Sequence, residues 1–457
     1  MSVGTANGAL GRVREAIDRL GAIADLNAIT RMRGDVALGE ARDLDAAAPD
    51  ARGPLHGLPI VVKDNIAVAG MPWTGASPAL DGLVAKADAP ALARLRAAGA
   101  VPVAQANMHE LALGITSANA HHGAVRNPAD PARMAGGSSG GTAAAVASGA
   151  VPAGLASDTG GSGRLPAALC GCIGFRPTVG RYPGGGLLTL SPTLDTPTLM
   201  ARGIDLLVRM DAVLTGALPG EGPVPPPPPP PSPERVRIGL ARGAFWQGLH
   251  SPVRDAAEAA TERLRAAGVE VVEVELPELR ALTDASGFAI AMRETADIWH
   301  AFARERLGTD LATLSARVAS PDVRGLLASL AADGAPPPDA YRAAMQEARP
   351  ALRRHLADAM ARERLDALAH PTAPVLAPML GETEEVELDG ARVPLFPAMT
   401  RNTLPTAVAC VPAISLPAGR MRVAGVDLPF GLELVGRHGA DARLLALAQR
   451  LAPALRP

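Results

Sequence analysis

Two glycine-rich segments that carry serines are the residues of this chain best suited to chemistry. Gly-Gly-Ser-Ser-Gly-Gly-Thr occupies residues 136–142, and Ser-Asp-Thr-Gly-Gly-Ser-Gly occupies residues 157–163. Glycine lets the main chain curl around a reacting carbonyl group and point N–H groups at it, because no Cβ stands in the way. A serine hydroxyl becomes a nucleophile when a base removes its proton and nearby donors stabilise the oxyanion. The two segments therefore indicate hydrolysis at a serine.

Ser162 is the candidate nucleophile, because it ends a run of main-chain N–H groups. Thr159, Gly160, Gly161 and Ser162 form that run, and its glycines permit the tight curl of an anion-binding nest. An ordinary glycine-rich turn explains this run alone equally well. Ser138 lies upstream in a second glycine cradle, and a hairpin-like return of the chain would bring the two serines together.

Other kinds of site fit these segments less well. A phosphate-binding loop over residues 136–142 would need a lysine where Gly141 stands. None of the nine histidines lies in or beside either segment. His109 precedes Glu110, but no second histidine follows at the spacing of a zinc-binding His-Glu-x-x-His helix. We expect no metal, and we interpret His109 as a structural polar residue.

Lys63 is the candidate base. It follows the apolar run Leu58–Val62, which predicts a short buried strand, and the carboxyl ends of strands in α/β sheets are where ligands bind. Burial disfavours the ammonium form and lowers the pKa of a lysine toward neutrality. A surface lysine paired with Asp64 is the alternative. The sequence alone favours that alternative, because lysines are rarely buried.

Alternating helical and strand patterns around these residues predict an α/β fold. Helices are expected over residues 8–20, 89–98, from Gly141, over 252–267, in a region reaching about residue 365, and from Asp441; strands are expected over 58–62, 101–104, 236–240, 269–274, 407–411 and 413–416. The helix from Gly141 would begin directly behind the first serine pair, so that its N-terminus faces the site.

Composition narrows the classes of partner and compartment. The 457 residues are 48% hydrophobic and carry a net charge of -2, which excludes a general attraction to nucleic acid or to an anionic membrane surface. No stretch has the pattern of a secretory signal or of an apolar membrane span of about 18 residues. Cys170, Cys172 and Cys410 are too few for a disulfide framework, and we expect them to be buried. These features predict a cytoplasmic protein.

A proline run over Pro225–Pro231 interrupts the pattern. Consecutive prolines adopt an extended polyproline conformation at a protein surface. A loop insertion is the favoured interpretation, and a recognition segment for a proline-binding partner is the alternative.

Three motifs together resemble the catalytic positions of the amidase signature family. They are Gly-Leu-Pro-Ile-Val-Val-Lys-Asp-Asn with Lys63, Gly-Gly-Ser-Ser-Gly-Gly with Ser138, and Asp-Thr-Gly-Gly-Ser with Ser162, at intervals similar to those of the family. The similarity continues through residues 164–178 and returns near residues 412–433. It therefore covers most of the chain, and its core motif is highly specific.

The resemblance implies one α/β body in which a twisted mixed β-sheet is sandwiched between layers of α-helices. Residues 1–457 would form a single domain, with a helical layer over 1–50, a catalytic core over 60–215, a proline-rich surface loop over 221–233 and the rest of the sheet and helices over 234–457. It further implies no cofactor and no metal, a small-molecule amide as substrate, and a possible homodimer.

The resemblance also implies a Ser-Ser-Lys triad. Ser162 would attack the amide carbonyl, Ser138, after a cis peptide bond from Gly137, would relay the proton, and neutral Lys63 would be the base. The N–H groups of residues 159–162 would form the oxyanion hole. Three further residues would support the site: Ser139 and Arg164 by hydrogen bonds around the serines, and Asp158 by bracing the nest. A helix-start or turn role is the alternative for each of the three.

One residue departs from the family pattern. The family usually carries a β-branched residue after the nucleophile, whereas this chain has Gly163. We expect the change to leave the triad intact and to loosen the turn or enlarge the acyl side of the pocket. Trp73 would line a pocket or, equally well, belong to the core or to an interface.

Four segments resemble the indoleacetamide and mandelamide hydrolase branch of the family. They are residues 107–111, 114–117, 174–178 and 401–403. This likeness implies hydrolysis of an arylacetamide or another small primary amide. An amidotransferase A-type subunit that supplies ammonia to a partner is the alternative, although that subunit usually has an Asn-Met-Asp-Glu segment where Asn-Met-His-Glu begins at Asn107. A catalytically silent amide-binding homologue is the third interpretation.

Overall fold

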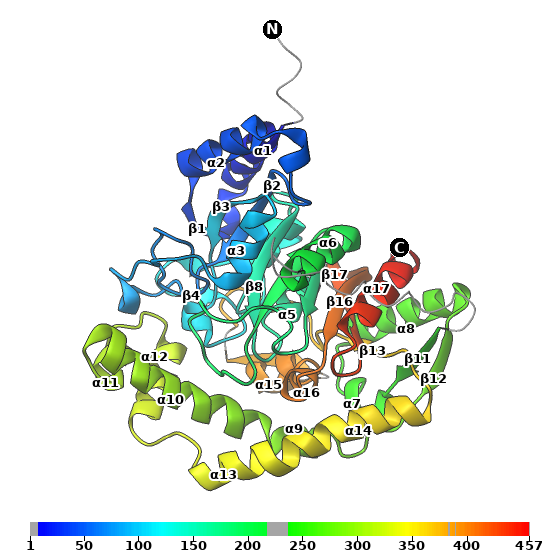
Figure 1. The fold of residues 1–457 in the computed structure, drawn as a ribbon. Coiled ribbons are helices and arrows are strands. Elements are labelled where there is room, and N and C mark those ends of the chain that lie inside the picture. The colour runs from blue at the N-terminus through cyan, green and yellow to red at the C-terminus, as the bar shows by residue number, and fades with distance from the viewer. Residues whose placement is uncertain (1–7, 217–235, 383, 389, 457) are drawn as a thin grey trace.

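A mixed β-sheet organises the chain (Figure 1) in a computed structural model that describes residues 8–216, 236–382, 384–388 and 390–456. In order across this eleven-stranded sheet lie β1 (Ile29–Met32), β3 (Ala100–Ala106), β2 (Leu58–Lys63), β8 (Ala153–Asp158), β10 (Thr196–Ala201), β9 (Ile173–Arg176), β16 (Ala413–Val423), β17 (Val426–Val435), β13 (Ala367–Pro371), β11 (Arg237–Leu240) and β12 (Glu270–Glu273). β2 runs parallel to β3 and β8, and β8 runs antiparallel to β10. The predicted α/β class with a mixed sheet is confirmed.

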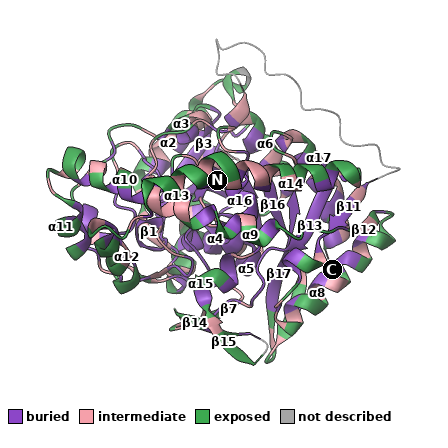
Figure 2. Cartoon of the chain, turned by 90° about the horizontal axis from the view of Figure 1, so that it is seen from below, coloured by how far each residue is buried: buried purple, intermediate pink, exposed green. Residues whose placement is uncertain are grey.

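Helices cover both faces of the sheet. One face is packed by α3 (Pro90–Ala97), α6 (Ile204–Thr215), α8 (Ser251–Ala266) and α17 (Asp441–Leu455), and the other by α1 (Ala9–Ala22), α2 (Gly34–Ala46) and α4 (Gly140–Ala147). Successive strand residues point to opposite faces, so Ile60 and Val62 join the first apolar core and Val61 joins the second. In Figure 2 the central strands are coloured as buried, and exposed residues lie along the outer side of α8.

A further group of helices runs along one edge of the molecule (Figure 1). It comprises α9 (Leu279–Asp284), α10 (Gly287–Leu307), α11 (Leu311–Ala316), α12 (Pro321–Ala331), α13 (Pro338–Ala343) and α14 (Arg349–Arg362). Apolar residues of α10, α11 and α12, such as Trp299 and Leu327, pack against Met108 and Leu111. This contact brings α10 and α12 close to the segment that follows β3.

The remaining α-helices and β-strands of the described chain are short. They are α5 (Arg164–Cys170), α7 (Arg242–Phe245), α15 (Leu395–Thr400), α16 (Leu404–Val408), and the paired strands β4 (Ala118–Asn119) with β5 (Gly123–Ala124), β6 (Arg126–Asn127) with β7 (Asp130–Met134), and β14 (Glu385–Leu388) with β15 (Ala391–Pro394). None of the described helices has the length and apolar character needed to cross a membrane. Cys170, Cys172 and Cys410 are buried and form no disulfide, as the sequence predicts.

The predicted strand over residues 407–411 is wrong. Leu404–Val408 form the helix α16, with Pro405 in its first turn, and Cys410 then takes a left-handed conformation. A short buried apolar run does not distinguish helix from strand by its periodicity, and proline in a first turn favours the helix. The sheet resumes only at Ala413. The proline run over Pro225–Pro231 lies outside the described residues.

Candidate active site

The candidate catalytic residues come from neighbouring elements at one edge of the sheet. Lys63 ends β2 and Asp158 ends β8, and these parallel strands are hydrogen-bonded neighbours. Parallel strands that end at the same edge place their last residues side by side. Ser138 lies two residues before the start of α4, and Ser162 lies in the turn between β8 and α5. The fold thus brings the three motifs together.

Lys63 is fully buried and hydrogen-bonds to two serines. Its Nζ donates to Ser138 Oγ at 2.8 Å and to Ser157 Oγ at 2.9 Å. Ser157 Oγ also accepts from Asn65 Nδ2 at 3.0 Å. Asp64 pairs instead with another cation, Arg31, at 3.1 Å. The alternative of a surface lysine paired with Asp64 is therefore wrong.

Burial sets the protonation of Lys63. Loss of hydration lowers the pKa of its ammonium group to about 7, although the charges of Asp158 and Asp195 oppose the shift. A lysine with a pKa near neutrality is present in part as the free amine, which can accept a proton. Lys63 combines this pKa with a direct contact to a serine hydroxyl, as a general base requires.

Ser138 and Ser162 lie in loops that are hydrogen-bonded to each other. The N–H of Ser139 donates to the carbonyl of Ser162 at 3.3 Å, and Ser139 Oγ donates to the carbonyl of Ser157 at 3.1 Å. The peptide bond between Gly137 and Ser138 is cis. No hydrogen bond joins Ser162 Oγ to any described residue, so its hydroxyl is free to face a cavity. Catalytic hydrogen bonds often tighten only when substrate binds.

Residues 159–162, the predicted nest, form a turn between β8 and α5. Gly161 has a φ of 133°, and a Cβ there would overlap the side chain of Thr403. Thr403 Oγ1 donates to the carbonyl of Gly160 at 2.8 Å. The N–H of Gly161 donates to Asp158 Oδ1 at 2.8 Å, so this donor is already engaged. The N–H groups of Gly160 and Ser162 have no hydrogen-bond acceptor among the described residues.

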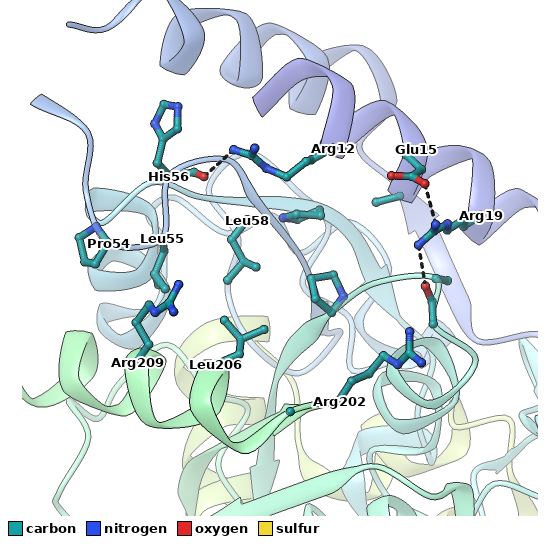
Figure 3. Close-up of a pocket in the computed structure, with 16 residues that line it drawn as sticks. Arg12, Glu15, Arg19, Pro54, Leu55, His56, Leu58, Arg202, Leu206 and Arg209 are labelled. Atoms are coloured by element: carbon teal, nitrogen blue, oxygen red, sulfur yellow. Dashed lines mark hydrogen bonds and ion pairs between the residues drawn. The ribbon is translucent and has the colours of Figure 1, made fainter. Parts of the chain in front are cut away.

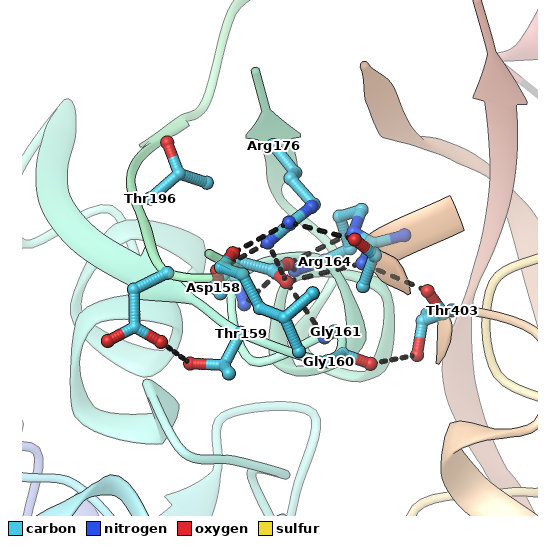
Figure 4. A network of polar contacts seen from close by, with 12 residues as sticks. Asp158, Thr159, Gly160, Gly161, Arg164, Arg176, Thr196 and Thr403 are labelled. Carbon is cyan, nitrogen blue, oxygen red and sulfur yellow. Dashed lines mark hydrogen bonds and ion pairs between the residues drawn. The ribbon is translucent and has the colours of Figure 1, made fainter. Parts of the chain in front are cut away.

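A buried charge network supports the nest from behind (Figure 4). Asp158 pairs with Arg164 at 3.0 Å and with Arg176 at 3.1 Å, and Arg164 also pairs with Glu433 at 2.6 Å. Burial alone would raise the pKa of Asp158, but the two arginines hold it well below its usual value. The carboxylate therefore stays charged and fixes the N–H groups of Gly161 and, at 3.1 Å, of Gly163.

Asp195 is a half-buried acid that the sequence did not single out. Its carboxylate accepts from Thr159 Oγ1 at 2.7 Å and from the N–H of Leu190 at 2.8 Å. Burial raises its pKa to about 6. Asp195 thereby anchors Thr159, the first residue of the nest.

The sequence contains weak indications of other site residues that the motif analysis missed. Ser157 stands inside the second serine motif, and Arg176 stands in the Gly-Phe-Arg-Pro-Thr segment, so both could have been noted. Asn65 and Thr403 stand inside longer motifs whose pattern does not distinguish them. Their contacts join segments far apart in the chain, which no local pattern reveals.

The expected effect of Gly163 on the pocket is corrected. A Cβ at this position would overlap Thr198 on β10, and Gly163 does not line the cavity beside Ser162. Thr198 therefore fills the space, and the missing side chain does not enlarge the acyl side. Trp73 is half-buried, packs against the core and donates from Nε1 to the carbonyl of Asn65 at 2.9 Å. It does not line this cavity either.

A cavity of about 350 Å³ opens beside Ser162. Its lining comprises Ala112, Leu113, Gly114, Ile115, Thr159, Gly160, Gly161, Ser162, Leu165, Leu190, Leu194, Gly287, Phe288, Ala291, Met292, Thr295, Leu326, Phe396, Thr400 and Leu404. None of these described lining residues is charged. Phe288 and Phe396 are 65% and 56% exposed, which identifies them as its outer rim. The arrangement combines a serine, a buried base and an apolar recess.

Comparisons with known proteins agree with this arrangement. A family model described as Amidase matches residues 12–445. A mandelamide hydrolase from Pseudomonas putida is 37% identical over 94% of this chain and 85% of its own length. An indoleacetamide hydrolase from Agrobacterium vitis is 38% identical over 88% of this chain and 84% of its own length.

Solved structures of similar proteins have the same fold. A crystal structure of an amidase superposes with a TM-score of 0.85 at 36% identity, covering 98% of this chain and 96% of that one. The native peptide amidase from Stenotrophomonas maltophilia gives 0.79 at 28% identity, with 98% and 93% covered. The A-type subunit of glutamyl-tRNA(Gln) amidotransferase from Thermotoga maritima gives 0.75 at 25% identity, with 100% and 95% covered.

Proposed function

This chain belongs to the amidase signature family of carbon–nitrogen hydrolases, and we propose that it hydrolyses a neutral arylacetamide-like amide to a carboxylic acid and ammonia. The observation that carries this proposal is the uncharged apolar cavity beside Ser162. The mandelamide and indoleacetamide hydrolases among its relatives support an aromatic acyl group.

The lining of the cavity supports an apolar acyl group in physical terms. Burying a charged group without a partner is costly, so a recess lined by leucines, alanines and Met292 would reject a charged substrate. Phe288 and Phe396 offer aromatic faces at the rim, where an aryl ring gains from offset or edge contacts. A small neutral amide with an aromatic ring therefore matches the site.

In the proposed reaction, neutral Lys63 accepts a proton from Ser138 while Ser138 accepts the proton of Ser162. Ser162 Oγ then bonds to the amide carbonyl carbon, and the electron pair of the C=O bond moves to the oxygen. The N–H groups of Gly160 and Ser162 donate to this oxyanion. The direct contact from Lys63 to Ser138, at 2.8 Å, supports this relay.

Breakdown of the intermediate uses the same residues in reverse. The C–N bond breaks, the relay passes its proton to the leaving nitrogen, and ammonia departs from an ester at Ser162. A water molecule gives its proton to the relay and attacks the ester carbonyl. Ser162 recovers its proton as the carboxylic acid is released, so each group returns to its starting state.

The amidotransferase alternative is less well supported by the same cavity. Glutamine carries an ammonium and a carboxylate group beside its side-chain amide, and both need charged or strongly polar partners. The described lining offers neither a carboxylate nor a guanidinium group. An independent hydrolase therefore fits the site better than a glutamine-dependent subunit.

The test is ammonia release by the purified chain from phenylacetamide, mandelamide, indole-3-acetamide, propionamide and glutamine. We expect turnover of the aryl amides, weak turnover of propionamide and none of glutamine. Ser162→Ala should abolish turnover, while the thermal midpoint stays within a few degrees. Equal activity in Ser162→Ala would remove Ser162 as the nucleophile. Turnover of glutamine alone would favour the amidotransferase alternative, and inactivity toward every amide would favour a silent homologue.

A further inference from the structure

A second and larger hollow lies away from the candidate active site and shares no lining residue with it. Its volume is about 770 Å³. The walls are α1 and the start of α6, and the segments 54–59 and 149–152 close it. Figure 3 shows arginines of both walls around this hollow.

The two walls present arginines at matching intervals. Arg12 and Arg19 lie on α1, whereas Arg202 lies just before α6 and Arg209 lies within it. On α1, Arg12 and Arg19 are seven residues apart, so they fall on nearly the same face of the helix, about 10 Å apart along its axis at a rise of about 1.5 Å per residue. Arg202 and Arg209 both line the second wall. Each wall therefore carries two guanidinium groups along the length of the hollow.

Positive charge dominates this lining. Glu15 is the only acid among the described lining residues, and Arg19 pairs with it at 2.6 Å. Arg202 and Arg209 are exposed, and neither guanidinium group has a hydrogen bond or ion pair within the described chain. Burial, followed by the charges of Arg52 and Arg12, lowers the pKa of His56 in the same lining. The hollow is thus a local site of positive charge on a protein whose net charge is -2.

The floor of the hollow is apolar. Figure 3 shows Leu55 and Leu58 beside Leu206, which projects from α6. Pro54 and Pro59 also line the hollow. Apolar surface gains from covering by apolar groups, at roughly 25 cal/mol per Å² of area removed from water. Guanidinium groups bind carboxylate, phosphate and sulfonate oxygens through charge-assisted hydrogen bonds. A ligand that fills the hollow would therefore contact both the apolar floor and the arginine side chains.

We propose that this hollow binds an organic anion with an apolar body. The apolar body lies on the leucine floor, and the anionic head contacts one of the two arginines without a partner in the described chain, Arg202 or Arg209. A simple inorganic anion would leave the floor uncovered, and a neutral apolar molecule would leave the arginines unused. The inference stands independently of the proposed amide hydrolysis, because the two sites share no residue.

The experiment is calorimetric titration of the full chain with octanoate, with octan-1-ol as the neutral probe of the same apolar body. Arg202→Glu/Arg209→Glu reverses the charges that the proposal requires. Arg420→Glu/Arg422→Glu makes the same change on exposed arginines of the β16–β17 hairpin. We expect octanoate to bind the native chain and Arg420→Glu/Arg422→Glu (the hairpin variant) with equal affinity. It should bind Arg202→Glu/Arg209→Glu (the α6 variant, named for the wall that carries both residues) at least tenfold more weakly. Octan-1-ol should bind all three at least tenfold more weakly than octanoate binds the native chain.

Octanoate could also enter the cavity beside Ser162, and a further variant separates the two sites. Phe288→Ala alters only that cavity and should leave the affinity for octanoate unchanged. The α6 variant should keep its thermal midpoint and its turnover of any amide that the native chain hydrolyses. Octanoate affinity that survives Arg202→Glu/Arg209→Glu, or that is lost in Phe288→Ala, would overturn the proposal. Equal binding of octan-1-ol and octanoate would overturn it as well.

Discussion

Lys63 Nζ lies 2.8 Å from Ser138 Oγ, although the two residues belong to a strand and to a loop that are 75 positions apart. The contact is fully buried, so water does not compete for either group. The chain contains 44 lysines and arginines, but only Lys63 and Lys86 are lysines. An arginine at position 63 would stay protonated at every relevant pH, whereas a buried lysine can lose its proton. The residue type and the contact together support the role of base.

The first prediction concerns the pH dependence of turnover. Burial lowers the pKa of Lys63 to about 7, so the cation dominates below this pH and no base is available. We therefore expect kcat/KM to fall tenfold per pH unit below about 7 and to level off above it.

The same pKa can be measured directly. Lysine labelled with ¹³C at Cε should give two signals, because the chain has two lysines, and Lys86→Arg assigns them. We expect the signal assigned to Lys63 to titrate near pH 7. A Lys63 signal that shows no titration near pH 7 and stays that of the ammonium form well above it would contradict the role of Lys63 as a neutral base.

The second prediction is that Lys63→Arg loses activity. The guanidinium group keeps the positive charge and its hydrogen-bond donors but cannot accept a proton. We expect kcat to fall by at least about 10²–10⁴-fold, the range attributed to general-base catalysis. Lys86→Arg, the matched control on the surface, should be unaffected. Thermal melting monitors folding, and a folded Lys63→Arg variant with the native rate would require another base.

How much of this site can be predicted from the sequence depends on how local its signals are. Lys63 at the end of an apolar strand and Ser162 after a glycine run are local patterns, and the structure places them at one sheet edge. The anchoring of Thr159 by Asp195 and of Gly160 by Thr403 depends on how separate segments pack. No spacing rule predicts such contacts, because long-range packing decides them.

In the fold, too, a local pattern predicts some elements and not others. Strand β2 is buried on both faces, and the uninterrupted apolar run Leu58–Val62 predicts it. The run over residues 407–411 is equally apolar, but its first residues belong to the helix α16. No local sequence pattern predicts that the space beside Gly163 is filled by Thr198, because the two residues lie in separate segments.

The third prediction assigns a positioning role to Asp195. Asp195→Ala removes the acceptor for Thr159 Oγ1 and should let the nest shift. Loss of an oxyanion donor costs about 10²–10³-fold in kcat, so a displaced nest should cost about 10- to 100-fold with little change in KM. Thr159→Val removes the same hydrogen bond from the other side. The double variant should be no worse than either single one, and exposed Asp205→Ala is the control.

Additive losses in that double-mutant cycle would show that the two residues act independently. A purely structural role would lower the thermal midpoint of Asp195→Ala and leave kcat of the folded fraction unchanged. The kcat measurement on folded protein therefore distinguishes positioning from stability.

The fourth prediction concerns the rim of the active-site cavity. Phe288→Ala removes an aromatic face that a substrate ring would contact, and such ring contacts contribute about 0.5–1.5 kcal/mol. We expect KM for phenylacetamide to rise about two- to tenfold with kcat nearly unchanged. Propionamide is too short to reach the rim, so its KM should not change. Val84→Ala, another exposed apolar residue outside this cavity, is the matched control. An equal rise of KM for both amides would contradict a ring-specific contact.

The fifth prediction concerns the exchange of volume between Gly163 and Thr198. Gly163→Val would place its side chain in the space that Thr198 fills, and overpacking of a core costs about 1–3 kcal/mol. We expect Gly163→Val to lower the free energy of unfolding by about that amount, as measured by urea denaturation. Thr198→Gly makes room, so the double variant should regain at least about 0.5 kcal/mol relative to the sum of the single changes.

The ratio of kcat/KM between phenylacetamide and propionamide separates this packing role from a role in substrate choice. Gly163 lies behind the nest and outside the cavity lining, so this ratio should be the same in the native chain, in Gly163→Val and in the double variant. A changed ratio at unchanged stability would mean that position 163 shapes the acyl pocket. Recovery of stability in the double variant with Thr198→Gly would mean that Thr198 in β10 compensates for the glycine at position 163. The two substitutions can depend on each other in this way only if their side chains share one space.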